Sequence, residues 1–108
     1  METRRLEKIN ELIHRFISEL IKRELDVDAL VTVSNVSTSA NGQETTIGVT
    51  VFPYSKSTAI LGELRKNLYE FQKKLNRGLR MRPVPKMIFE IDESEEKGSQ
   101  ILRAIDKL

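Results

Sequence analysis

Residues 30–52 decide the fold, and they read LVTVSNVSTSANGQETTIGVTVF. β-Branched residues dominate both ends of this stretch, and Asn41-Gly42 stands between them. Strands favour β-branched residues, and Asn-Gly is the strongest short-range hairpin signal because both residues tolerate positive φ. We therefore predict a hairpin of two strands, residues 30–38 and 44–52. Alternation in the second strand places one apolar set on a single face of the sheet: Ile47, Val49 and Val51.

Helical periodicity flanks this hairpin on both sides. Before it, over residues 4–25, apolar residues recur at spacings of three and four: Leu6, Ile9, Ile13, Phe16, Ile17 and Leu20. After it, the same period runs from residue 60 to residue 79: Ile60, Leu61, Leu64, Leu68, Phe71, Leu75 and Leu79. At 100° per residue the second set occupies a sector about 100° wide. Each set predicts an amphipathic helix.

The C-terminal third adds a strand and a last helix. Pro83 and Pro85 stop the second helix, and residues 86–91 then alternate, which predicts a third strand with Met87, Phe89 and Ile91 facing inward. Asp92 and Glu95 have the spacing of a capping box that opens a last helix. The predicted order is α-β-β-α-(α)-β-α. This is a single α+β domain over residues 1–108, a three-stranded sheet with its helices packed on one face.

Composition excludes several classes of function. The 108 residues include no cysteine, which excludes a disulfide scaffold, a thiol nucleophile and the usual zinc motifs. A single histidine, His14, excludes a multi-histidine metal site. No apolar run approaches the roughly 20 residues that a membrane span needs. We expect a soluble cytoplasmic monomer with no cofactor, no metal, no membrane contact and no catalytic activity.

The net charge of +2 hides one strongly basic segment. Residues 56–86 carry nine basic side chains and two acidic ones, a net charge of +7. Residues 1–25 have a net charge of +1, and residues 26–55 and 87–108 have −3 each. Such asymmetry indicates a polyanion as the partner.

The basic residues of the second helix project away from its apolar sector. At 100° per residue they form a stripe about 20 Å long: Lys66, Lys73, Arg77 and Arg80, with Tyr69 beside them. We expect the four cations to contact nucleic-acid phosphates and Tyr69 to stack on a base or cover the helix. Further cations extend or flank the stripe: Arg82, Lys86, Arg65 and Lys74.

Alternatives remain open for each of these cations. A lysine-rich helix face is often only a solvated one, and Arg82 has the alternative role of capping the end of the preceding helix. The outer cations of the first helix are weaker candidates because acidic residues lie between them: Lys8, Arg15 and Lys22.

Four segments in order resemble the ribosome-binding factor A family over nearly the whole chain. The most specific one, residues 79–92, reads LRMRPVPKMIFEID. The others are residues 5–26, 30–36 and 94–101. The resemblance implies a KH-like fold of the second type that binds the small ribosomal subunit late in its maturation. It also implies rRNA near the 5′ terminal helix as partner, no catalysis, and release before translation.

The chain departs from that family where its two KH helices meet. The family has an alanine–x–glycine kink there, whereas this chain has Asn67-Leu68-Tyr69. Tyr69 replaces the glycine that permits a sharp turn, and Gln72 replaces a cation. We therefore expect a weakly kinked or continuous helix over residues 60–79. Two other functions remain possible: a KH-like RNA binder without ribosome specificity, and a protein-interaction module for an acidic partner.

Overall fold

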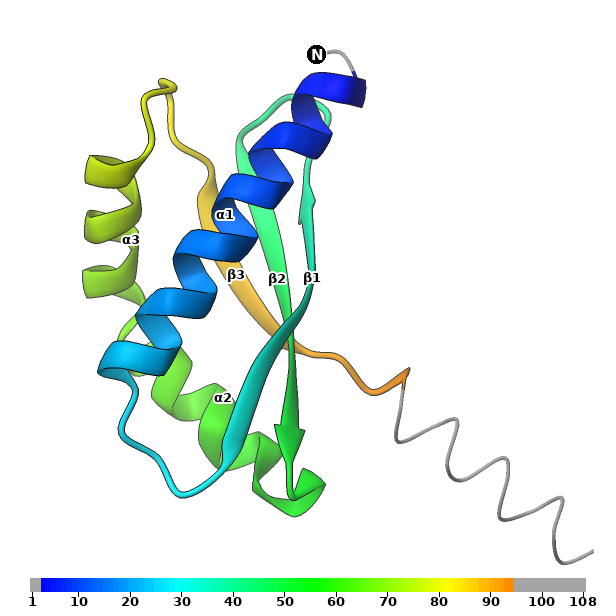
Figure 1. Ribbon diagram of the computed structural model, residues 1–108, viewed down its shortest axis with the longest axis vertical. Helices are drawn as coiled ribbons and strands as arrows, with labels where there is room; N and C mark the ends of the chain where they lie inside the picture. Colours follow the sequence, from blue (N-terminus) through cyan, green and yellow to red (C-terminus); the bar gives the residue numbers. More distant parts are fainter. Residues whose placement is uncertain (1–2, 95–108) are drawn as a thin grey trace, which may run out of the picture.

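A computed structural model describes residues 3–94 of the chain (Figure 1). Its elements, in order, are α1 (Thr3–Glu24), β1 (Leu30–Thr38), β2 (Glu44–Phe52), the 3-10 turn η1 (Tyr54–Lys56), α2 (Ser57–Lys66), α3 (Leu68–Gly78) and β3 (Lys86–Ile91). The three predicted strands are confirmed at their predicted bounds. The last helix of the predicted order falls outside the described residues.

The sheet is mixed and has the strand order β1-β2-β3. β1 and β2 pair antiparallel through the predicted hairpin, where only Gly42 takes a positive φ, 72°. β3 pairs parallel to β2, because α2 and α3 carry the chain back to the start of β2 (Figure 1). This connection puts β1 at one edge of the sheet and β3 at the other.

One face of the sheet is buried under the helices. Of the predicted inward residues of β2 and β3, five are buried and Ile91 is half-buried against the core: the buried ones are Ile47, Val49, Val51, Met87 and Phe89. On the opposite face, Thr46 and Thr50 of β2 are half-buried, and the intervening residues of β3 are exposed, with Ile88 43% exposed. α1 lies across the sheet and contributes its own apolar stripe to the core (Figure 1). The α+β fold with helices on one face is therefore confirmed.

A bulge explains why β1 alternates only in part. Val33 pairs with Val49 and Asn35 pairs with Gly48, so Ser34 is an extra residue in the ladder. The extra residue shifts the alternation of inward and outward side chains by one position. Val33 and Val36 are therefore both in the core although they are three positions apart.

The prediction of a weakly kinked or continuous helix over residues 60–79 is wrong. The structure has two helices there, α2 and α3, and they run in different directions (Figure 1). Asn67 separates them with φ −91° and ψ 1°, a conformation that any residue can adopt. Its side-chain Nδ2 and its backbone N–H both donate to the carbonyl of Glu63, at 2.8 and 3.1 Å. A break of this kind needs no glycine, so Tyr69 does not prevent it.

α3 ends at Gly78, where it passes close to α1. An added Cβ at Gly78 would lie 2.4 Å from Cε2 of Phe16, so the two helices approach as closely as they do only because this position has no side chain. Leu79 follows with extended backbone, at φ −97° and ψ 139°. Arg80 therefore lies outside the helix, contrary to the predicted stripe.

Candidate nucleic-acid interface

The described cations of residues 56–86 divide into those held by the fold and those that are not. Lys56 belongs to the first group, since its Nζ donates to the Asp28 carboxylate at 2.9 Å. This bond lowers the pKa of Asp28 and ties η1 to the segment before β1.

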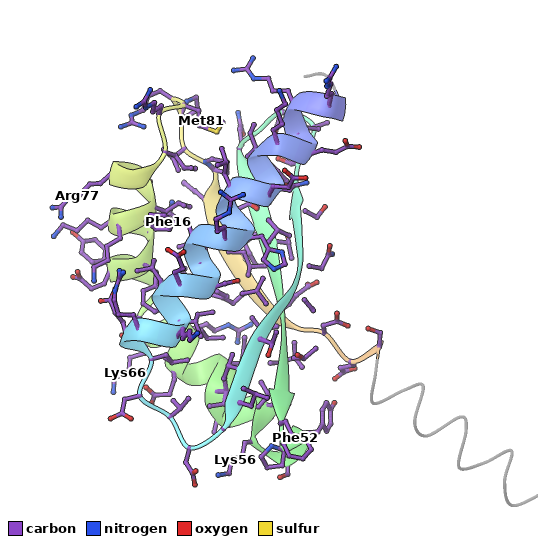
Figure 2. All side chains as sticks on the ribbon, in the orientation of Figure 1. Phe16, Phe52, Lys56, Lys66, Arg77 and Met81 are labelled. Atoms are coloured by element: carbon purple, nitrogen blue, oxygen red, sulfur yellow. The ribbon has the colours of Figure 1, made fainter. Side chains whose placement is uncertain are left out.

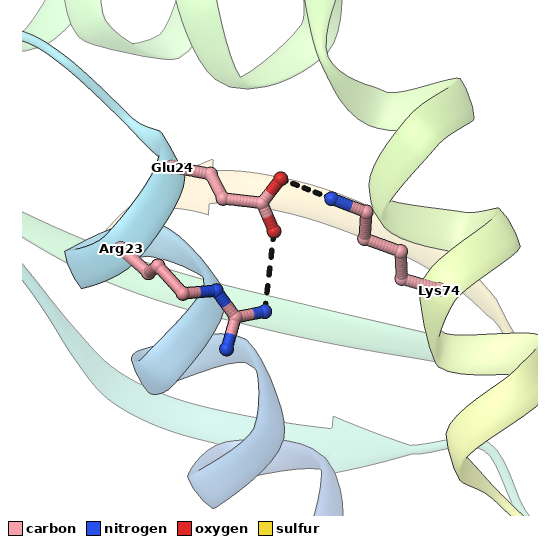
Figure 3. A network of polar contacts seen from close by, with 3 residues as sticks. All are labelled: Arg23, Glu24 and Lys74. Atoms are coloured by element: carbon pink, nitrogen blue, oxygen red, sulfur yellow. Dashed lines mark hydrogen bonds and ion pairs between the residues drawn. The ribbon is translucent and has the colours of Figure 1, made fainter.

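Lys74 is also held by the fold (Figure 3). Its ammonium forms an ion pair with the Glu24 carboxylate, and Arg23 Nη2 reaches the other oxygen of that carboxylate at 3.3 Å. The bond from Lys74 is the main cause of the lowered pKa of Glu24. Lys74 therefore joins α3 to the end of α1.

Arg82 takes the structural role that the sequence left open. Its Nη1 donates to the carbonyl oxygens of Leu79 and Met81, at 2.8 and 2.7 Å. Leu79 is the C-cap residue that follows α3, so the guanidinium caps the chain where it leaves the helix.

Gln72, which stands where the resembling family has a cation, pins the start of β3. Its Nε2 donates to the carbonyl of Pro85 at 3.0 Å, and its Oε1 accepts the N–H of Met87 at 2.9 Å. The side chain thus satisfies two backbone groups at the edge of the sheet. Nothing in the local sequence around Gln72 indicates this role.

The second group of cations lies along the outer side of α3. We call Lys66, Tyr69, Lys73 and Arg77 the α3 flank. All four are exposed or half-buried, and Tyr69 is 74% exposed. Lys66 is the last residue of α2 and Arg77 is in the last turn of α3, and both lie on the same side of the molecule (Figure 2). The break at Asn67 therefore puts Lys66 on a different helix from Lys73 and Arg77 but on the same side.

Within the α3 flank, Lys73 lies over the ring of Tyr69, with its Nζ 5.8 Å from the ring centroid. This cation–π distance holds an aromatic face and a positive charge side by side on an open surface. Among residues 3–94 the ion pairs are Arg23–Glu24, Lys56–Asp28 and Lys74–Glu24, so no cation of the α3 flank is neutralised within that range.

The remaining predicted cations lie apart from the α3 flank. Arg80 is exposed in the segment that connects α3 to β3, and Arg65 is exposed near the end of α2. Lys86 is the exposed first residue of β3, opposite Glu44 in the parallel register. The structure therefore keeps Lys73 and Arg77 on one helix, leaves Lys66 at the end of the preceding helix, and puts Arg80 in the connection to β3.

Residues 3–94 offer neither of two other classes of site. No three His, Cys, Asp or Glu side chains there are placed to hold a metal ion. No helix in the same range has the length and apolar character to cross a membrane.

The element order and the one-sided sheet define a KH-like α+β domain, and the α3 flank gives it a basic surface with no ion-pair partner among residues 3–94. Over residues 5–105 the chain matches the sequence model of the family described as ribosome-binding factor A, and it belongs to that family. The resemblance read from its motifs is thereby confirmed.

Individual relatives agree. The chain is 32% identical over 111 residues to ribosome-binding factor A of Prochlorococcus marinus (strain NATL1A), covering 98% of this chain and 90% of that protein. It is 30% identical over 106 residues to that of Thioalkalivibrio sulfidiphilus, covering 95% and 82%.

Solved structures show the same fold. The crystal structure of ribosome-binding factor A from Thermus thermophilus superposes with a TM-score of 0.72 at 24% identity, covering 80% of this chain and 94% of that one. A homology model of the Thermus thermophilus factor, fitted into a cryo-EM map of a 30S–RbfA complex, superposes with a TM-score of 0.65 at 25% identity. That match covers 76% of this chain and 89% of the other.

Proposed function

We propose that this protein is an assembly factor of the small ribosomal subunit and binds the subunit's rRNA through the α3 flank. Family membership supports the ribosomal role, as does the 30S complex into which the Thermus thermophilus factor was fitted. The choice of the α3 flank as the binding surface rests on which cations lack an ion-pair partner. Lys66, Lys73 and Arg77 have no ion-pair partner among residues 3–94, whereas neighbouring Lys74 does.

The proposed action is binding without chemistry. An exposed row of cations engages phosphates of the RNA backbone, and the counterions that this displaces drive association. Tyr69 offers a ring face to an unstacked base beside those phosphates. Arg65, Arg80 and Lys86 extend the contact, and Arg82 and Lys74 act mainly by holding the fold. By the family's pattern the target lies near the 5′ terminal helix, and a cytoplasmic monomer leaves before translation.

The test is cosedimentation with purified small subunits, large subunits and whole ribosomes at two salt concentrations. We expect selective retention on free small subunits. Three engaged phosphates contribute a slope of nearly −3 to a plot of log affinity against log salt. The variant Lys66→Gln/Lys73→Gln/Arg77→Gln should therefore lose on the order of a hundredfold in affinity near 0.1 M salt.

A matched control removes three charges from α1, as Arg15→Gln/Lys22→Gln/Arg23→Gln. These side chains are exposed and lie outside the α3 flank, so we expect nearly unchanged binding. Equal losses from both variants would overturn the α3 flank as the binding surface. Equal binding to both subunits would leave only a general RNA binder, and binding that bulk RNA does not compete would indicate an acidic protein partner.

A further inference from the structure

Three cations cluster at the beginning of α1. Arg4, Arg5 and Lys8 are exposed, and Lys8 is a helix neighbour of both arginines because it lies four residues from Arg4 and three from Arg5. None of them takes part in an ion pair within the described range. Residues with the same charge at these spacings repel one another, so this cluster does not help α1 to form.

The position of the cluster along the helix is also unfavourable for folding. The first turn of α1 contains no acidic residue, and the positive end of the helix dipole disfavours cations there. Glu7 lies three residues from Arg4 and Glu11 three residues from Lys8, but neither acid forms an ion pair with them among the described residues.

The other cations of α1 lie in its last turn or have an acidic neighbour on each side. Lys22 and Arg23 are in the last turn, where the dipole favours them, and Arg15 is four residues from both Glu11 and Glu19.

Packing turns the side of α1 that carries Arg5 toward the segment that carries Arg80. Arg5 precedes Phe16 by eleven residues, which is about three turns, so both lie on one side of α1 about 16 Å apart. Phe16 lies against Gly78. The segment after Gly78 runs to the end of the molecule at which α1 begins (Figure 1).

The first turns of α1 and the segment of residues 79–85 therefore occupy one end of the molecule (Figure 1). The β1–β2 turn lies at the same end, since Thr38 Oγ1 donates to Asn10 Oδ1 at 2.6 Å and the N–H of Lys86 donates to the carbonyl of Gln43 at 2.9 Å. Met81 is labelled at this end of the molecule in Figure 2, and its partly buried side chain packs against the core.

We propose that Arg4, Arg5 and Lys8, together with Arg80, form a second phosphate-binding surface that extends the RNA contact from the α3 flank over this end of the protein. The proposal rests on the proposed function. Its ligand is the phosphodiester backbone of the same rRNA, at a segment other than the one on the α3 flank. The charges of Arg4, Arg5 and Lys8 oppose helix formation and form no ion pair within residues 3–94. Binding to RNA gives them a role.

The first test compares Arg4→Gln/Arg5→Gln with Arg15→Gln/Lys22→Gln. Each variant removes two charges from the same helix. For small subunits we expect the first to lose tenfold or more in affinity and to lower the salt slope by one to two, while the second changes affinity by less than twofold. The melting temperature of the first should stay equal or rise, which separates lost binding from lost folding.

The second test locates the ligand. Because the chain has no cysteine, a single cysteine carries a tethered Fe(II)-EDTA group at one chosen place. Glu7→Cys places it beside the α1 cluster, Glu70→Cys on α3, and Glu19→Cys away from both. We expect cleavage of small-subunit rRNA from positions 7 and 70, at different nucleotides, and little from position 19.

The outcomes separate the two proposals. If the α3-flank variant loses binding while Arg4→Gln/Arg5→Gln behaves like its control, the second surface is wrong and the proposed function stands. If neither variant loses binding, both are wrong. Cleavage from position 70 but not from position 7, with affinity still lost in the α1 variant, would assign this end of the molecule to an acidic protein surface and overturn the RNA contact.

Discussion

The hydroxyl of Ser34 donates a hydrogen bond of 2.6 Å to Asp92 Oδ2, which joins residues 58 positions apart in the chain. Ser34 is the extra residue of the β1 bulge, and Asp92 directly follows β3. The bond therefore crosses β2 at Gly48, whose carbonyl oxygen lies 3.2 Å from the same hydroxyl. Asp92 Oδ1 also accepts the N–H of Ser94 at 3.0 Å, as a helix N-cap would. The bulge thus ties all three strands together where the chain leaves the sheet.

This relationship predicts a specific acid sensitivity. The Ser34 hydroxyl, followed by the hydroxyl and N–H of Ser94, lowers the pKa of Asp92 from 3.8 to about 2. A carboxyl with a depressed folded pKa stabilises the fold above its unfolded pKa, and this contribution is lost as the pH falls through the folded value. We expect Ser34→Ala to raise the Asp92 pKa and to weaken the stability loss between about pH 4 and pH 2.

Titration of the Asp92 carboxyl carbon by NMR measures the shift directly. Ser37→Ala is the matched control, because Ser37 is an exposed serine of the same strand. An Asp92 pKa that is the same in Ser34→Ala and in the parent would show that the bond does not form in solution.

Adjacent lysines of α3 should have different roles. Lys73→Gln removes an exposed cation of the α3 flank, and we expect weaker small-subunit binding with a salt slope reduced by about one. Lys74→Gln removes the ion pair with Glu24, so we expect a lower melting temperature and nearly unchanged binding. Measurements of salt-dependent binding and of thermal unfolding for both variants check this. Equal binding losses would contradict the assignment of Lys73 to binding and Lys74 to folding.

The contact between α1 and α3 predicts opposite effects at two helical glycines. Gly78→Ala would push a Cβ to 2.4 Å from Phe16 and should destabilise the domain by about 1–3 kcal/mol. Gly62→Ala in α2 meets no atom within 4 Å and should stabilise it by about 0.4–1 kcal/mol. Urea unfolding measures both values. A double variant that adds Phe16→Leu should recover part of the loss at Gly78.

Two adjacent apolar residues of β3, Ile88 and Phe89, face opposite sides of the sheet. Phe89 is 3% exposed and packs edge-on against Phe71, with ring centroids 6.4 Å apart. Phe89→Ala should cost about 3–5 kcal/mol, a large fraction of the roughly 5–15 kcal/mol that stabilises a typical domain. Ile88→Ala, on the open face, should cost less than half as much. A Phe89→Ala melting temperature within a few degrees of the parent would contradict this placement of the core.

Much of the fold was determined by the sequence alone. Period-two alternation identified Val49 and Phe89 as inward residues, and Asn41-Gly42 located the hairpin. Both signals are local, because a strand side chain faces one side of the sheet or the other and a tight turn needs a residue that tolerates positive φ. The motif of residues 79–92 also identified the family correctly.

Tertiary structure alone decided where the helix breaks. An apolar stripe continues across Asn67 because both α2 and α3 bury apolar residues, each against different parts of the core. A conformation open to any residue leaves no mark on residue type. The local sequence does not indicate the bulge at Ser34 either, because the hydroxyl of Ser34 bonds to Asp92, which is far along the chain.

The cations show the same division. Composition identified a basic segment, and helical spacing placed Lys73 on the stripe and Lys74 beside it, but neither could show that Lys74 has an ion-pair partner. Lys74 is neutralised because α1 brings Glu24 to it from 50 residues away, and Lys73 is left exposed beside Tyr69. Which charges remain for a partner depends on contacts distant in sequence, so only the folded chain decides it.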